Sequence, residues 1–85
     1  MGKTWHEHAE YDPDADAIYV YLRDAKVVKT VAIDDFRNID YDGEGRVVGV
    51  EFLDVSGGID LHYVPQADRV GQLIGDLNLG IRVFA

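Results

Sequence analysis

The sequence predicts an α+β fold in which an antiparallel β-meander of four to six strands packs against one C-terminal amphipathic helix. The main observation is the stretch RNIDYDGEGRVVGVEFLD at residues 37–54, where two runs of alternating apolar residues flank a tight turn. Such a pattern predicts a β-hairpin. Similar alternation precedes the hairpin, whereas helical spacing of apolar residues follows it. We therefore expect a single domain over residues 1–85, with the sheet first and the helix afterwards.

Three further strands are expected before the hairpin, because short runs of apolar residues alternate with polar ones. The second run, AIYVYLR, is rich in the β-branched and aromatic residues that favour strands. In the first run, His6 and His8 fall on one face. These strands are predicted at residues 4–11, 17–23 and 27–34, with turns around Pro13 and at residues 24–26, so residues 4–54 form the strand-rich part.

The turn Asp42-Gly43-Glu44-Gly45 predicts the register of the hairpin. If Asp42 faces Gly45, then Tyr41 faces Arg46 and Ile39 faces Val48. In this register Ile39 and Tyr41 share one face with the apolar residues of the second strand, as cross-strand packing requires.

The C-terminal third predicts a loop, a helix and a tail. The loop is expected at residues 55–58, where the sequence reads VSGG, and residues 59–64 are a short apolar run. The helix is expected at about residues 66–77, because Pro65 suits a first turn and apolar residues follow at helical spacing, namely Val70, Leu73, Ile74 and Leu77. Residues 79–85 are predicted to be a terminal strand or an apolar tail able to recruit a second subunit.

Composition excludes several function classes. The chain has sixteen acidic against eight basic residues and a formal net charge of −8, which repels nucleic-acid phosphates and suits a basic protein partner. It has no cysteine, and therefore neither disulfides nor thiolate metal sites. No run approaches the ~20 apolar residues of a membrane helix, and the start lacks the apolar run of a signal peptide. We expect a cytoplasmic protein without direct nucleic-acid or membrane binding.

Two patterns are compatible with metal binding. His6, His8 and Glu10 alternate along one strand face, a geometry that suits zinc, nickel or copper. The second pattern begins at Asp40 and approximates the spacing of a calcium loop through Glu44 to Glu51. In the predicted register, however, Asp40 faces Val47, so Glu51 lies about 13 Å further along its strand and cannot close the cage. The Asp40–Glu44 turn is still predicted to be able to bind a cation weakly. No cofactor is predicted.

Two motifs carry a resemblance to a known family. Residues 11–20, YDPDADAIYV, and residues 40–53, DYDGEGRVVGVEFL, resemble the domain-of-unknown-function family 2283. The resemblance implies a small prokaryotic protein without an established activity. It also implies a gene beside that of a small basic toxin-like protein, and hence an antitoxin-like role.

The favoured function is a small acidic interaction module, a homodimer that neutralises a basic protein partner. Its predicted contact residues are apolar or aromatic groups beyond the core face: Tyr19, Tyr21, Phe36, Ile81, Val83 and Phe84. The alternative is a metal-binding protein or metal-dependent enzyme that uses His6, His8 and Glu10 or the Asp40–Glu44 turn. No serine lies in a nucleophile-elbow context, which favours a role other than catalysis.

Overall fold

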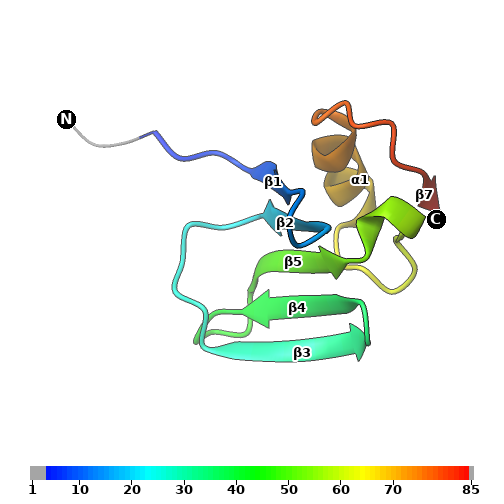
Figure 1. The fold of residues 1–85 in the computed structure, drawn as a ribbon. Helices are drawn as coiled ribbons and strands as arrows, with labels where there is room; N and C mark the ends of the chain where they lie inside the picture. The colour runs from blue at the N-terminus through cyan, green and yellow to red at the C-terminus, as the bar shows by residue number, and fades with distance from the viewer. Residues whose placement is uncertain (1–3, 85) are drawn as a thin grey trace.

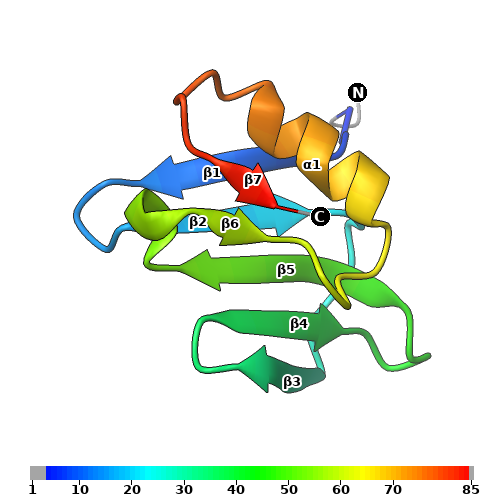
Figure 2. The same ribbon diagram turned by 90° about the vertical axis from the view of Figure 1, so that its right-hand side faces the viewer.

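A computed structural model describes residues 4–84 of the chain. It has two layers: a five-stranded antiparallel sheet, and a second layer that contains one helix and a small parallel pair of strands (Figures 1 and 2). This arrangement confirms the predicted α+β class and the helix on the sheet. No helix within residues 4–84 combines the length and the apolar character that a membrane span requires.

The strand order is β1-β2-β5-β4-β3, so the sheet is meander-like rather than a simple meander. The hairpins β1–β2 and β3–β4 lie on either side of β5, and residues 22–28 carry the chain from one hairpin to the other. Figure 2 shows β5 in the middle of the sheet. The strands are β1 (His8–Asp12), β2 (Ala17–Tyr21), β3 (Lys29–Asp34), β4 (Arg37–Tyr41) and β5 (Val47–Leu53).

The predicted register of the β4–β5 hairpin was wrong. Ile39 lies opposite Val50 rather than Val48, and Tyr41 lies opposite Val47, with an irregularity between Asp40 and Tyr41. The cause is the Asp42 side chain, which accepts hydrogen bonds from the amides of Glu44 and Arg46 and so holds a longer loop. Because Ile39 moves by two residues relative to β5, it stays on the expected face.

The helix α1 (Ala67–Gly75) buries Val70, Leu73 and Ile74 against the sheet. It begins after Gln66, whose φ of 54° is left-handed, so Pro65 precedes the helix instead of occupying its first turn. The core that α1 closes contains Ile18, Val20, Val50 and Phe52 from β2 and β5. Burial of each such side chain contributes about 1.5–3 kcal/mol.

The C-terminal segment pairs with its own chain. After the 3₁₀ turn η1 (Val55–Gly57), β6 (Ile59–Asp60) runs parallel to β7 (Val83–Phe84). The amides of Ile59 and Leu61 donate to the carbonyls of Arg82 and Phe84. The Phe84 ring lies so close to Gly58 that a Cβ there would overlap it. The terminal strand is thus anchored beside α1 (Figure 2).

Candidate functional site

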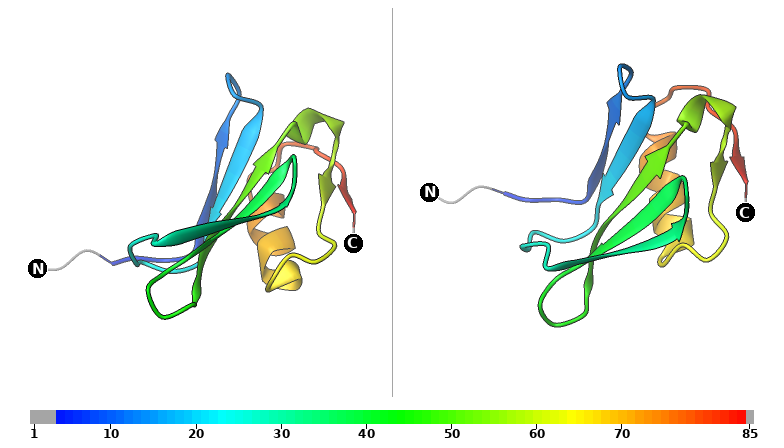
Figure 3. Two further views of the ribbon diagram at one scale, coloured as in Figure 1. Left: turned by 90° about the horizontal axis from the view of Figure 1, so that it is seen from below. Right: turned by 60° about the horizontal axis from the view of Figure 1, so that its bottom comes forward.

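The face of the sheet opposite α1, here called the outer face, carries most of the polar side chains of the strands. In Figure 3, α1, β6 and β7 lie on one side of the sheet, and no other helix or strand of residues 4–84 covers the opposite side. Cross-strand pairing aligns two rows on this face. One row is His8, Tyr21, Gly49, Asp40 and Thr30, and the other is Glu10, Tyr19, Glu51, Asn38 and Ala32.

A hydrogen bond on the outer face joins β2 to β4 across β5. The Tyr19 hydroxyl donates to Oδ2 of Asp40 at 2.6 Å, and the Thr30 hydroxyl donates to Oδ1 at 2.5 Å. Burial, followed by the bond to Asp40, raises the pKa of Tyr19, so its hydroxyl remains a donor. The ring crosses β5 over Gly49, where a Cβ would overlap both the ring and the Val20 carbonyl. Glycine at position 49 is therefore required for the bridge.

Beside this bridge, three rings adjoin one another. The His8 and Tyr21 rings stack with centroids 4.6 Å apart, and the Tyr19 and Tyr21 centroids are also 4.6 Å apart. His8 Nδ1 lies 3.0 Å from the His6 carbonyl, and Nε2 lies 3.0 Å from a Glu10 carboxylate oxygen. The His6 carbonyl and then Glu10 raise the pKa of His8, since both acceptors favour a doubly protonated ring.

A shallow hollow of about 290 Å³ lies at the other end of β2 on the outer face. Glu10 and Glu51 are the two cross-strand neighbours of Tyr19, so a carboxylate stands on each side of the tyrosine. Glu51 also accepts a hydrogen bond of 2.9 Å from Asn38. We call this site the acidic hollow; its outer-face lining is Glu10, Asp12, Ala17, Tyr19, Glu51 and Leu53.

The acidic hollow combines three features that suit a cationic side chain. Carboxylates attract the charge, Tyr19 contributes aromatic surface to the lining, and Ala17 and Leu53 provide apolar surface for an aliphatic stem. Lysine and arginine have both a stem and a cationic head. An anionic ligand would meet repulsion at the same place.

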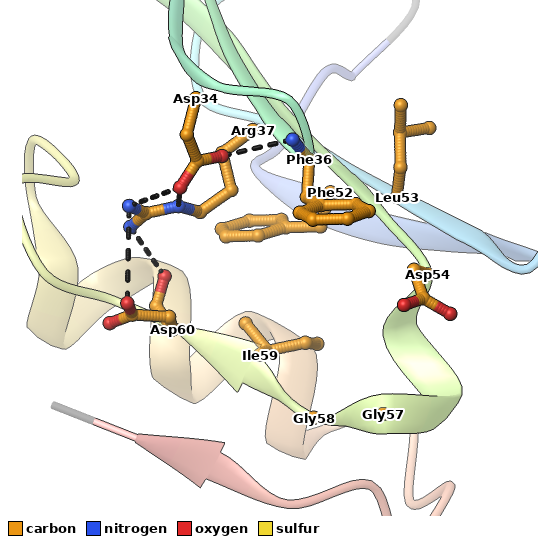
Figure 4. A pocket seen from close by; sticks show the side chains of 10 residues that line it. All are labelled: Asp34, Phe36, Arg37, Phe52, Leu53, Asp54, Gly57, Gly58, Ile59 and Asp60. Atoms are coloured by element: carbon orange, nitrogen blue, oxygen red, sulfur yellow. Dashed lines mark hydrogen bonds and ion pairs between the residues drawn. The ribbon is translucent and has the colours of Figure 1, made fainter.

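A second hollow, of about 200 Å³, lies on the opposite side of the sheet around Arg37 (Figure 4). Arg37 is only 6% exposed and donates to Asp34 through Nε at 3.1 Å and Nη2 at 2.9 Å. Its Nη1 donates to the carbonyls of Asp60 at 2.9 Å and His62 at 2.5 Å. The guanidinium holds the pKa of Asp34 below its usual range. Because the donors of Arg37 are engaged, this group clamps β6 and the following loop to the sheet.

Sequence reasoning missed Arg37 as an important residue. A signal was present, because Arg37 is two residues from Ile39 and so shares the apolar face of a strand. A buried arginine at such a position requires several partners. Two of these partners, the carbonyls of Asp60 and His62, come from a segment whose approach to β4 depends on the tertiary fold.

The predicted contact residues fall into separate regions. Tyr19 and Tyr21 lie together on the outer face, beside the predicted metal ligands His8 and Glu10. Phe36 is 52% exposed in the turn between β3 and β4 and lines the Arg37 hollow. Ile81, Val83 and Phe84 belong to the C-terminal segment on the side of α1, where the Arg82 guanidinium lies 4.9 Å from the Phe84 ring centre. The two tyrosines and the C-terminal segment therefore lie on opposite sides of the sheet.

Most of the predicted metal ligands bond to one another or to other residues, as His8 does to Glu10. Across residues 4–84, no three histidine, aspartate or glutamate side chains gather as a metal-holding group. In the Asp40–Glu44 turn, Asp42 bonds Arg46 while Asp40 bonds Tyr19 and Thr30. The predicted spacing of this turn was also wrong, because Asp40 faces Gly49 rather than Val47. Glu51 is therefore two residues further along β5 instead of four.

Comparison with known proteins assigns a family. Residues 8–56 match the family described as "Protein of unknown function (DUF2283)". The chain belongs to this family. The DUF2283 match extends from β1 to η1 and so contains the whole five-stranded sheet, including the acidic hollow. The chain is also 45% identical over 82 residues to the uncharacterized protein MJ0789 of Methanocaldococcus jannaschii, an alignment that covers 88% of this chain and 70% of that protein. No solved structure matches the chain.

Proposed function

We propose that this DUF2283 protein binds a positively charged segment of a protein partner, and that the acidic hollow is the binding site. The observation that carries the proposal is the row Glu10, Tyr19 and Glu51, in which two acidic residues are the cross-strand neighbours of one tyrosine beside a hollow. A lysine or arginine laid along Tyr19 contacts the ring with its stem and reaches either carboxylate with its head.

The charge of the whole chain supports this choice of partner. A net charge of −8 draws a basic protein toward the molecule from a distance and raises the rate of encounter. The hollow then supplies a specific place for one cationic side chain. Neutralisation of a small basic protein, the antitoxin-like role that the family resemblance implies, is one function that such binding would serve.

Binding of simple cationic peptides tests the proposal. We expect fluorescence anisotropy to show that labelled decalysine and decaarginine bind the full chain, whereas labelled decaglutamate does not. The double variant Glu10→Gln/Glu51→Gln should bind about tenfold more weakly, since two close charge contacts are lost. Raised salt should weaken the wild-type interaction, because exposed charges are screened over about 10 Å at 0.1 M salt.

The matched control is Asp68→Asn/Asp76→Asn, which removes the same two charges from exposed positions in and just after α1, on the other side of the sheet. This control should retain nearly full affinity. Equal weakening by both double variants would show attraction by overall charge alone. That result, or binding of neither cationic peptide, would contradict a role for the acidic hollow.

A further inference from the structure

The edge of β3 that points away from β4 is an open edge of the sheet. β3 is the last strand in the order β1-β2-β5-β4-β3, and no other strand within residues 4–84 pairs with its far side. The direction of its backbone groups follows from β4. The Leu53 amide donates to the Phe36 carbonyl, so alternate residues of β4 from Phe36 onward face β5, and Ile39 faces β3. Val31 pairs with Ile39, which leaves the amides and carbonyls of Thr30 and Ala32 facing outward.

Apolar side chains in β3 and just before it are also left uncovered by the second layer. Val31 is 37% exposed and Val28 is 64% exposed, because α1 packs mainly on β1 and β2. Both valines line a hollow of about 430 Å³ together with Tyr41. An open edge beside exposed apolar groups is a surface suited to strand pairing.

We propose that a second copy of this chain pairs with β3 in antiparallel orientation, about a two-fold axis that passes beside Val31. In this register Thr30 of each copy lies opposite Ala32 of the other, and the two residues exchange amide–carbonyl hydrogen bonds. Val31 faces its own counterpart on the inner face, at the close spacing of a pair without hydrogen bonds. A shift by one residue would place side chains of the inner face opposite side chains of the outer face. The proposed register avoids this mismatch and uses the outward amides and carbonyls of both Thr30 and Ala32.

Charge complementarity favours a second copy over another partner. β3 begins with Lys29, and Asp34 and Asp35 stand at its end. In this register Lys29 of each copy lies opposite Ile33 of the other, two residues from Asp35, and the symmetry repeats the contact between Lys29 and Asp35. A uniformly basic partner would meet Lys29 unfavourably, whereas the edge is complementary to itself.

The ladder is short, which sets the expected strength of the dimer. The register of β3 with β4 is irregular between Ala32 and Asp34, and such bulges limit pairing along an edge. We therefore expect a reversible dimer whose population rises with protein concentration. This dimer does not depend on the acidic hollow, which lies at the opposite end of the sheet on β1, β2 and β5.

Sedimentation velocity over a wide range of protein concentration tests the dimer. The wild-type chain should pass from monomer to dimer. Val31→Lys places like charges opposite each other and should weaken dimerisation by at least about tenfold. Ala32→Pro removes an outward amide and should have a similar effect. The control Leu79→Lys puts the same charge at a residue that is 41% exposed outside β3 and should leave the dimer unchanged.

A charge exchange provides a second readout that does not rely on strand disruption. Lys29→Glu and Asp35→Lys should each weaken the dimer, and the double variant should restore it, because positions 29 and 35 again carry opposite charges. Circular dichroism melting confirms that each variant is folded. A wild-type chain that stays monomeric throughout, or a dimer that Val31→Lys and Ala32→Pro leave intact, would overturn the proposal.

Discussion

At the residue scale, Gly49 makes a long-range contact possible. The Tyr19 ring crosses the central strand at this glycine, and the tyrosine hydroxyl then reaches Asp40 on the next strand. A glycine inside a strand ordinarily weakens it, because the residue loses more backbone entropy and packs no side chain. Here the ring of Tyr19 fills the space that a side chain at position 49 would take.

Gly49→Ala should therefore destabilise the protein by about 1–3 kcal/mol, the usual cost of forcing a group into filled space. Urea unfolding followed by circular dichroism measures the change. The matched control is Gly75→Ala at the end of α1, where a Cβ meets nothing within 4 Å. That substitution should stabilise the protein by about 0.5–1 kcal/mol, because alanine has the higher helix propensity. Equal stability of wild type and Gly49→Ala would show that the ring does not lie over Gly49.

At the scale of elements, Arg37 links the two layers. Its guanidinium bonds one carboxylate within the β3–β4 hairpin and two carbonyls in the segment that leads to α1. A planar group with several fixed donors can hold three such acceptors together, whereas an ammonium group cannot match their geometry. The position of β6 beside the sheet depends on this fork (Figure 4).

Arg37→Lys should lower the free energy of unfolding by at least about 1.5 kcal/mol, since charge-assisted hydrogen bonds are lost from a buried site. Hydrogen exchange should accelerate at residues 59–64 before it does in β2 or β5. The comparison variant is Arg46→Lys, which keeps an ion pair with Asp42 at a side chain that is 48% exposed. It should change stability by less than about 0.5 kcal/mol. Similar losses in both variants would argue against a clamp at Arg37.

At the scale of the whole molecule, we expect stability to fall both when the pH is lowered and when it is raised. Hydrogen bonds from the Arg46 backbone, the Arg37 side chain and the His62 backbone lower the pKa of Asp42, Asp34 and Asp60, respectively. Each carboxylate contributes stability above its ordinary pKa of 3.8, and this contribution is lost as pH falls through the lower folded value. His8 behaves in the opposite way. Its raised pKa adds stability below 6.5 that is lost as pH rises through the folded value.

Thermal melting as a function of pH should therefore show greatest stability between the ordinary pKa values of 3.8 and 6.5. His8→Gln should remove the part of the decline above pH 6.5 that comes from the imidazole. Direct titration of the His8 ring by NMR provides an independent check. A folded His8 pKa at or below 6.5 would contradict the hydrogen bonds that the structure gives this ring.

Local pattern was sufficient to predict the sheet strands in outline, their faces and the α+β class. The first strand was predicted to begin at residue 4, whereas β1 begins at His8, so His6 precedes the strand. Alternation places Tyr19 and Tyr21 on the face opposite Ile18 and Val20, and the structure agrees. The hairpin register failed because the Asp42 side chain lengthens the loop through its own hydrogen bonds. The alternation of apolar residues in a strand does not indicate which backbone amides a carboxylate in the turn will bond.

The position of β5 and the acidic hollow depend on tertiary pairing and could not be read from spacing. Glu10 and Glu51 are 41 positions apart, and each is an ordinary polar residue in its own strand. They flank Tyr19 only because β1 and β5 pair with opposite sides of β2. The sequence offered one cue, since alternation predicts that Tyr19 and Glu10 leave the apolar face.

The central place of β5 has a consequence for how this protein is made. On the ribosome, β1–β2 and β3–β4 emerge first, yet they share no neighbour until the stretch ending at Leu53 has been translated. Isolated two-stranded hairpins are marginally stable in water. A nascent chain that stops short of Leu53 therefore contains two hairpins that do not pair with each other. Synthesis of the seven-residue strand β5 completes the strand that pairs with both hairpins and joins them in one sheet.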